Sequence, residues 1–227
     1  MIEKLNWDSE FFGNPVGKLY VETPESFDEE AFVKAASAYK LVYIFAEIPL
    51  NYSRFALPVD VKLTFQKLLK SQIPETQLQL FDPDLHKYAE LQKLAFQSGE
   101  YSRFKTDPNF DAKDFYRMYE IWINKSFQSE LSVVLVEAAD NRLTGFVSLD
   151  FKDAETANIG LIAVDSKVRG KGVGRNLMEQ AESAASKAGK KYIRVATQQE
   201  NALATNFYEK QGYSLADQLF IYHYWNL

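Results

Sequence analysis

The sequence predicts an α/β fold, an α+β mixed sheet flanked by helices and preceded by a smaller α/β unit. The first observation is a β-hairpin signature, two strand-like runs at 131–137 and 143–151 joined by a polar turn. The second is a pair of apolar, strand-length runs at 157–164 and 192–197. The third is the segment 172–188 between them, whose apolar residues recur at helical spacing. Together they give the order hairpin, strand, helix, strand.

The remaining C-terminal elements follow from residues that end or begin helices. Gly189 stands where a helix over 172–188 needs a C′ residue. Asn201 opens a further helix, which Gly212 ends. An aromatic-rich strand over 218–225 completes the series.

The N-terminal third has the pattern of a separate, smaller unit. Residues 11–21 and 41–48 are strand-like, with a helix expected between them over 28–38. Ser26 is the expected N-cap of that helix, and Glu29, three residues on, completes a capping box.

A further strand is expected over 61–68, after which the pattern breaks. We place the domain boundary near residue 75, which gives an N-terminal domain 1–75 and a C-terminal domain 76–227. Two helices are then expected, one over 82–97 capped by an Asp-Pro-Asp run and one over 112–126.

Composition excludes several classes of function. The chain has no Cys, which excludes disulfides, thiolate metal sites and a cysteine nucleophile and fits a cytoplasmic location. Its two His residues show no ligand spacing, so no metal is expected. A net charge of −5 argues against a nucleic-acid partner. No apolar run reaches the roughly 18 residues of a membrane helix, so no membrane partner is expected.

A glycine-rich loop follows the strand that ends at Val164. Gly170, Gly172 and Gly174 let the backbone turn tightly with its N–H groups pointing one way. The helix that begins there adds unpaired N–H groups and the positive end of its dipole, which bind anions. More positive charge comes from the basic side chains Lys167, Arg169, Lys171 and Arg175. The loop is therefore a candidate pyrophosphate site, with an ordinary glycine-rich turn as the alternative.

The pattern Arg169-x-x-Gly172-x-Gly174, between a strand and a helix, resembles the acyl-CoA loop of the GNAT family of N-acetyltransferases. It lacks the Gly-Lys-Ser/Thr ending of a P-loop and the later acidic residue of a Rossmann fingerprint. The resemblance implies a GNAT fold with acetyl-CoA as co-substrate. The residues that it implies for binding acetyl-CoA are Leu161, Ile162, Ala163, Val164, Arg169, Gly170, Lys171, Gly172, Val173, Gly174, Arg175 and Asn201.

Acetyl transfer to an amine requires a hydrogen-bond donor for the thioester carbonyl and an acid for the departing thiolate. A backbone N–H of the strand at 161–164 can serve the carbonyl oxygen. The segment from Asn201 to Tyr213 resembles the family pattern N-x-x-A-x-x-x-Y-x-x-x-G-(F/Y), which implies that Tyr208 is the acid. A packing role beside Phe207 is the alternative for Tyr208. No general base is assigned, because no carboxylate near these strands stands out from surface carboxylates.

A second resemblance concerns the acceptor. The segments 7–13, 102–104 and 193–198 resemble parts of the TDP-fucosamine acetyltransferases, which acetylate a TDP-linked 4-amino-4,6-dideoxygalactose. It implies a small-molecule amine acceptor, a nucleotide sugar, bound by Ser102, Arg103 and Phe104. Arginine forms bidentate contacts with phosphate, and the aromatic residues of this loop offer a flat surface to a base. An ordinary polar surface loop is the alternative.

Other functions stay open at this stage. The same fold would serve an acetyltransferase of another amine, such as an antibiotic, a polyamine or a peptide N-terminus. It would also serve a non-catalytic acyl-CoA-binding module, although Tyr208 and the complete loop argue against that. A homodimer is compatible with the sequence, which specifies neither the oligomeric state nor the pathway.

Overall fold

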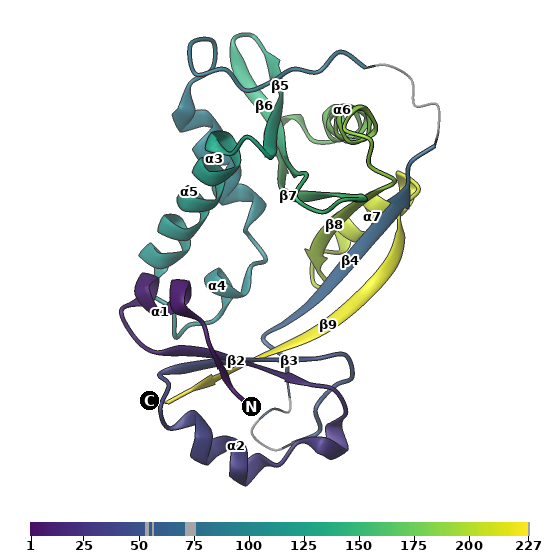
Figure 1. Ribbon diagram of the computed structural model, residues 1–227. Helices are drawn as coiled ribbons and strands as arrows, with labels where there is room; N and C mark the ends of the chain where they lie inside the picture. The colour runs from purple at the N-terminus through teal and green to yellow at the C-terminus, as the bar shows by residue number, and fades with distance from the viewer. Residues whose placement is uncertain (53–54, 56, 71–75, 227) are drawn as a thin grey trace.

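In the computed structural model, the strands join into a nine-stranded mixed sheet with helices on both faces (Figure 1). The described residues are 1–52, 55, 57–70 and 76–226. The strands are β1 (Glu3–Lys4), β2 (Val16–Val21), β3 (Leu41–Ala46), β4 (Asp60–Leu68), β5 (Ser132–Ala139), β6 (Arg142–Asp150), β7 (Thr156–Val164), β8 (Tyr192–Gln198) and β9 (Ser214–Trp225). The helices are α1 (Asn6–Phe12), α2 (Glu29–Ala36), α3 (Tyr88–Ser98), α4 (Arg103–Thr106), α5 (Ala112–Gln128), α6 (Val173–Lys187) and α7 (Ala202–Lys210).

The strand order is β1-β2-β3-β9-β4-β8-β7-β6-β5. The pairs β2–β3 and β7–β8 are parallel, and the other neighbouring strands are antiparallel. β4 and β9 are long strands that run diagonally between the two ends of the molecule (Figure 1). Because β9 pairs with β3 on one side and β4 on the other, it joins the N-terminal strands to the rest of the sheet.

The helices bury apolar faces against both sides of the sheet. On one side, α6 and α7 contribute Leu177 and Tyr208 to a buried cluster that also holds Phe65 of β4. On the other side, α3 packs over β6 and β7, and Leu91 of α3 and Phe146 of β6 belong to one buried cluster. Each fully buried side chain of this kind stabilises the fold by roughly 1.5–3 kcal/mol.

The predicted C-terminal elements are present, and their turns have the expected backbone. Asp140 and Asn141 have φ of 51° and 59°, as a two-residue type I′ hairpin turn requires. Gly189 and Gly212 follow α6 and α7 with φ of 71° and 83°, which is the left-handed conformation of helix-ending glycines. The hairpin, the helix-ending glycines and the order of elements predicted for 131–225 are confirmed.

The N-terminal boundaries differ from those predicted. Phe11 and Phe12, assigned above to a strand over 11–21, belong to helix α1, and the strand begins only at Val16. Gly13, with φ of 67°, ends this helix. The aromatic residues favour the helix because they pack on α5, where the guanidinium of Arg117 lies 4.6 Å from the ring centre of Phe11.

Two helix starts also differ. The helix expected over 28–38 is α2, whose N-cap is Asp28 and not Ser26, because the Asp28 carboxylate accepts the N–H of Ala31 at 2.9 Å. The helix expected over 82–97 starts only at Tyr88. Asp82 instead closes a turn, since its carbonyl accepts the N–H of His86 at 2.7 Å.

The two predicted domains contribute strands to the same sheet. Residues 71–75, at the predicted boundary, lie outside the described part of the chain. β4 precedes that boundary, yet it pairs with β8 and β9, the C-terminal strands of the sheet. The division into 1–75 and 76–227 therefore stays a prediction about folding units, while the sheet itself is continuous.

Candidate active site

β7 and β8 pair over only part of their length. Their register covers 156–159 and 192–195, beyond which β7 continues to Val164 and β8 to Gln198. The two strands therefore diverge after Ile159 and leave unpaired backbone between them. A cavity of about 510 Å³ lies on the diverging part of β7, between the end of α3, the start of α6 and α7. A cavity of this size fits a small-molecule site.

The glycine loop forms one wall of this cavity. Gly170 and Gly172 have φ of 78° and 88°, and no atom lies within 4 Å of the position that a Cβ would take. α6 begins at Val173, and no side chain caps it. Its first N–H groups are consequently free to bind an anion, beside the exposed cations Arg169 and Arg175. The backbone and charge of the loop fit a pyrophosphate.

Most residues predicted to bind acetyl-CoA line this cavity. They are Ile162, Ala163, Val164, Arg169, Gly170, Gly172, Val173, Gly174, Arg175 and Asn201, together with Tyr208. Leu161 and Lys171 do not line it: Leu161 packs among buried apolar residues, and Lys171 is exposed.

Some cavity residues were not predicted from the sequence. They come from the end of α3 and from α7: Gln97, Ser98, Glu100, Tyr101, Leu203, Ala204 and Phe207. Gln97 donates from Nε2 to the carbonyl of Val164 at 2.6 Å, which ties α3 to β7. No motif marks the α3 residues, because only the packing of α3 over β7 brings them here.

The pairing of β7 with β6 determines which N–H groups face the cavity. In an antiparallel pair, successive residues alternately bond the partner and point away from it. The N–H of Asp165 donates to the carbonyl of Thr144 in β6 at 2.8 Å, so the N–H of Ala163, two residues earlier, also points toward β6. The N–H groups of Ile162 and Val164 therefore point toward the side that β8 has left. The N–H of Leu161 is already bonded to a serine hydroxyl of β6 at 2.8 Å.

Tyr208 lies on α7 and lines the cavity. The helix is capped by Asn201, whose side-chain oxygen accepts the N–H of Ala204 at 3.2 Å. Tyr208 is 4 % exposed and packs against Phe65, so the packing role and the cavity position coexist. Burial raises the pKa of Tyr208, which keeps its hydroxyl protonated. The hydroxyl is thus a proton donor held at the edge of the cavity.

The three predicted acceptor residues begin helix α4, away from the cavity wall. Ser102 caps this helix, accepting the N–H of Phe104 at 3.3 Å, and both residues are buried. The guanidinium of Arg103 lies 4.4 Å from the ring centre of Phe104 and 5.3 Å from that of Tyr43. Of these three residues, only Arg103 keeps part of its side chain accessible, and the predicted role of Ser102 and Phe104 in acceptor binding stays a prediction.

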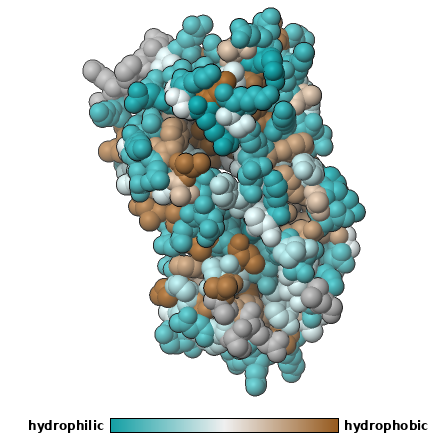
Figure 2. Space-filling view, turned by 180° about the vertical axis from the view of Figure 1, so that it is seen from behind, coloured by the Kyte–Doolittle hydropathy of each residue, from teal (hydrophilic) through white to brown (hydrophobic). Residues whose placement is uncertain are grey.

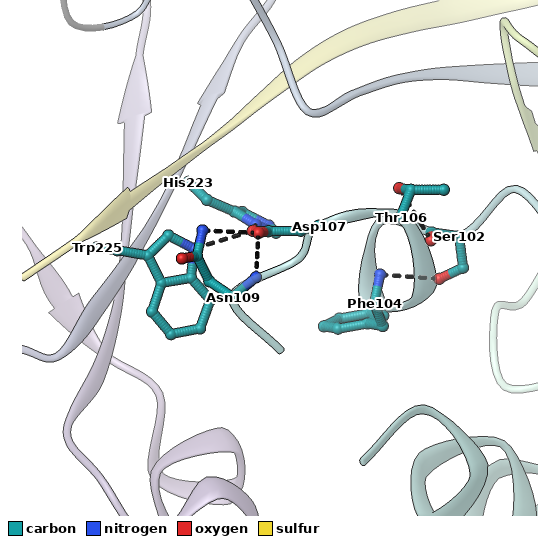
Figure 3. Close-up of polar contacts among 7 residues, drawn as sticks. All are labelled: Ser102, Phe104, Thr106, Asp107, Asn109, His223 and Trp225. Carbon is teal, nitrogen blue, oxygen red and sulfur yellow. Dashed lines mark hydrogen bonds and ion pairs between the residues drawn. The ribbon is translucent and has the colours of Figure 1, made fainter. Parts of the chain in front are cut away.

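Asp107, just after α4, holds this helix against β9 (Figure 3). Its carboxylate accepts hydrogen bonds from His223 at 2.6 Å and from Trp225 at 2.9 Å. Asn109 adds two more, from its N–H and its side-chain amide, each at 2.9 Å. Burial alone would raise the pKa of Asp107, but these hydrogen bonds outweigh it and lower the pKa to about 2.

Two carboxylates that the sequence did not single out lie near Arg103. Asp8 comes from α1 and Asp60 from the first position of β4. Burial raises the pKa of Asp60 to about 6, although the positive charge of Arg103 opposes this shift. Burial also raises the pKa of Asp8, again against Arg103. These neighbours favour Arg103 as their counter-ion over its predicted contact with a diphosphate.

The sequence held only weak signs of this arrangement. Asp8 lies inside the segment 7–13 noted above, but aromatic residues dominate that segment. Asp60 is a single acidic residue at the start of an apolar strand, a position that is usually solvated. Among the described residues, His, Asp and Glu side chains form no group with the geometry of a metal site.

The chain belongs to the acetyltransferase (GNAT) family, whose pattern matches residues 99–213. It is therefore an N-acetyltransferase, and the glycine loop, the diverging strands and Tyr208 all lie within or beside the matched part. The family uses acetyl-CoA, whose pyrophosphate fits the free N–H groups and cations at the start of α6.

One curated protein is similar to this chain in sequence, and several solved structures share its fold. Over 220 residues the chain is 29 % identical to a dTDP-fucosamine acetyltransferase of Escherichia coli O6:H1, covering 93 % of this chain and 92 % of that one. A conserved protein of unknown function from Staphylococcus epidermidis has the same fold, with a TM-score of 0.62, 14 % identity, and coverage of 94 % and 84 %. A GCN5-related N-acetyltransferase from Sphaerobacter thermophilus gives a TM-score of 0.53, 16 % identity, and coverage of 87 % and 65 %.

None of the described helices combines the length and the apolar character that a bilayer crossing requires. The face seen in Figure 2 is largely hydrophilic, and its hydrophobic atoms form several separate groups among polar ones. Scattered apolar groups of this kind are ordinary for a protein surface.

Proposed function

We propose that the chain transfers the acetyl group of acetyl-CoA to the amino group of a nucleotide-linked amino sugar, a TDP-4-amino-4,6-dideoxyhexose. The observation that carries this proposal is the 29 % identity to a dTDP-fucosamine acetyltransferase over 93 % of the chain. Because that similarity covers 93 % of the chain, it extends well beyond residues 99–213, which match the family pattern.

A surface of β4 and β8 supports an extended, anionic acceptor. Lys62 lies opposite Gln198, and Gln66 lies opposite Arg194, so these four side chains share one face of the sheet. Arg194 is exposed and donates from Nε to Gln66 at 2.6 Å, while Lys62 is half-buried. We call this surface the cationic strip. It lies on the same face as Asp60, two residues before Lys62, and offers two cations for a diphosphate.

The residues of the cavity have matching roles in this proposal. The N–H groups at the start of α6, with Arg169 and Arg175, hold the pyrophosphate of acetyl-CoA. The N–H of Ile162 or Val164 stabilises the charge that develops on the carbonyl oxygen. Tyr208 gives its proton to the departing thiolate. Acetyl-CoA itself supplies the activated acetyl group.

The test compares two acceptors, the TDP-linked amino sugar and the free 4-amino-4,6-dideoxyhexose, in the same acetyl-transfer assay. The proposal expects kcat/KM to be at least about 10-fold higher for the TDP derivative, as one charge-assisted contact of roughly 1.5–3 kcal/mol gives. Lys62→Ala and Arg194→Ala should lower that preference, whereas Lys34→Ala on α2 should keep it. Equal kcat/KM for the two sugars would mean that the enzyme does not recognise the nucleotide, although it would still be an acetyltransferase.

A further inference from the structure

The first step concerns the place of Asp60 in the sheet. It is the first residue of β4, and its neighbour Val61 accepts the N–H of Gln199 at 2.8 Å. Gln199 begins the connection from β8 to α7, which contains the cavity residue Asn201. Asp60 therefore lies beside the open end of β8, where that strand has separated from β7.

The second step concerns the hydrogen bonding of Asp60. The residue is 8 % exposed, and its Oδ1 atom is buried with no hydrogen-bond partner among the described residues. The Nε atom of its neighbour Arg103 is also buried without a partner there. A buried acceptor without a donor is costly, so an orphaned carboxylate oxygen is rarely kept without a use. A ligand with N–H groups would satisfy it.

The third step compares the other carboxylates and bases in the region. Glu100 lines the cavity, but it is exposed and paired with Lys105 at 3.0 Å. The Asp107 carboxylate is fully used by four hydrogen bonds. His223 has a free Nε2, but it sits on the part of β9 that pairs with β3, away from β8. Among these described groups, Asp60 is thus the buried carboxylate beside β8 that has an oxygen without a hydrogen-bond partner.

We propose that the Asp60 carboxylate is the general base of acetyl transfer and takes the proton of the acceptor amino group at Oδ1. As the nitrogen forms its bond to the carbonyl carbon, one N–H proton passes to Asp60. The carbon–sulfur bond then breaks, its electron pair stays on sulfur, and the Tyr208 hydroxyl protonates that sulfur. The products are the N-acetyl compound and the free thiol, and Asp60 and Tyr208 regain their starting protonation from solvent.

The charges around Asp60 suit this role. Arg103 and Lys62 lie near it and favour its ionised form, Gln198 hydrogen bonds to it, and Tyr119 of α5 faces the same region. Burial outweighs them and raises its pKa to about 6, so the group is a stronger base than an ordinary carboxylate and is still ionised at neutral pH. This inference rests on the acetyl transfer of the family and not on the identity of the sugar.

The experiment measures kcat against pH for the wild type and Asp60→Asn, with acetyl-CoA and the TDP-linked amino sugar. We expect wild-type kcat to rise with pH through about 6, because the base must be ionised. Asp60→Asn should lower kcat by about 10²-fold or more and lose this ascending limb, with KM for acetyl-CoA unchanged. Asp60→Glu should restore part of kcat and the limb, which also covers the case in which the Asn variant does not fold.

Matched variants decide between Asp60 and its neighbours. Glu100→Gln and Asp8→Asn each remove another carboxylate of this region. In both variants kcat should still rise with pH through about 6, as it does in the wild type. A limb that persists in Asp60→Asn, or that disappears in Glu100→Gln, would overturn the assignment. The same profiles can be recorded with the free amino sugar, so a missing nucleotide preference and a failed assignment of Asp60 give separate results.

Discussion

The carboxylate of Asp107 and the imidazole of His223 are joined by a hydrogen bond of 2.6 Å that connects α4 to β9. Because the pKa of Asp107 is about 2, its carboxylate is ionised and can only accept. Nδ1 of His223 therefore carries the hydrogen, and burial lowers the pKa of this imidazole, so it is neutral. This contact holds α4, and with it Arg103, at a fixed distance from the sheet.

Asp107→Asn is expected to destabilise the chain by about 1–3 kcal/mol, because the charged acceptor of four hydrogen bonds becomes neutral. The folded pKa of about 2 lies below the ordinary value of 3.8. The stability that Asp107 contributes is therefore fully present above pH 3.8 and is lost as pH falls through about 2. Urea unfolding at neutral pH measures the change, with the exposed Asp84→Asn as control. Equal effects of the two variants would contradict the prediction.

Asp60→Asn should have the opposite effect on stability. Its folded pKa of about 6 lies above the ordinary 3.8, so the folded chain binds this proton more tightly than the unfolded chain. The contribution is fully present below pH 3.8 and is lost as pH rises through about 6. At pH 8 the Asn variant should therefore be more stable by about 1–3 kcal/mol, and the gain should vanish near pH 4. Thermal unfolding at the two pH values measures it, and a pH-independent change would argue against a buried charge.

The double variant Arg169→Glu/Arg175→Glu should weaken acetyl-CoA binding by roughly 10-fold or more, since it reverses two charges beside the pyrophosphate site. Lys171→Glu is the matched control, because Lys171 belongs to the same loop but does not line the cavity. Calorimetric titration with acetyl-CoA distinguishes the two. An equal loss of affinity in the control would mean that only the net charge of the loop matters.

A bulky side chain at Gly174 would be a less specific test of the pyrophosphate site than the double variant Arg169→Glu/Arg175→Glu. A Cβ at Gly174 would lie 3.3 Å from the ring of Phe207, so valine there would push against α7 as well as the ligand. The loop charges are exposed, and their exchange leaves the packing of α6 on α7 unchanged.

Tyr208→Phe should keep acetyl-CoA affinity and lower kcat by about 10²-fold, the usual scale for losing a general acid. Tyr213→Phe is the matched control, since Tyr213 is buried in the same cluster but does not line the cavity. Steady-state kinetics with a substrate whose chemical step is rate-limiting measures both. A normal rate for Tyr208→Phe would assign the proton to another group.

Arg103→Ala should act on the carboxylates near it. Without the guanidinium, the pKa of Asp60 should rise further, and the ascending limb of kcat should move to higher pH with any acceptor. A diphosphate contact predicts something else, a KM increase of about 10–100-fold that appears only with the TDP-linked sugar. The pH profiles of the variant with both sugars separate these roles.

The sequence predicted best where a residue type has one dominant use. Glycines with left-handed backbone, such as Gly172 and Gly189, marked the loop and a helix end. Tyr208 of the second motif lines the cavity, and its role as the acid stays a prediction. The start of the strand predicted over 11–21 was wrong because Phe11 suits a strand as well as a helix, and only its contact with Arg117 on α5 decides between them.

The cluster formed by Asp8, Asp60 and Arg103 could not be predicted, because these residues are distant from one another in the chain. Asp8, Asp60 and Arg103 come from α1, β4 and α4, and only the closure of the sheet by β9 brings these elements together. Isolated charged residues are usually solvated, so neither burial nor a raised pKa is visible in the pattern. Gln97 and Glu100 were not expected at the cavity either, because only the packing of α3 over β7 brings them there.

The position of β9 in the sheet also sets an order for biosynthesis. Leu41 of β3 and Asp60 of β4 emerge early from the ribosome, but their partners Trp225 and Ile221 belong to the last strand of this sequence. Until that strand is made, β3 and β4 each present an unpaired edge, a form that invites pairing with other chains. A nascent chain of this protein therefore depends on β9 to close the sheet, and chains shortened before β9 should aggregate rather than fold in part.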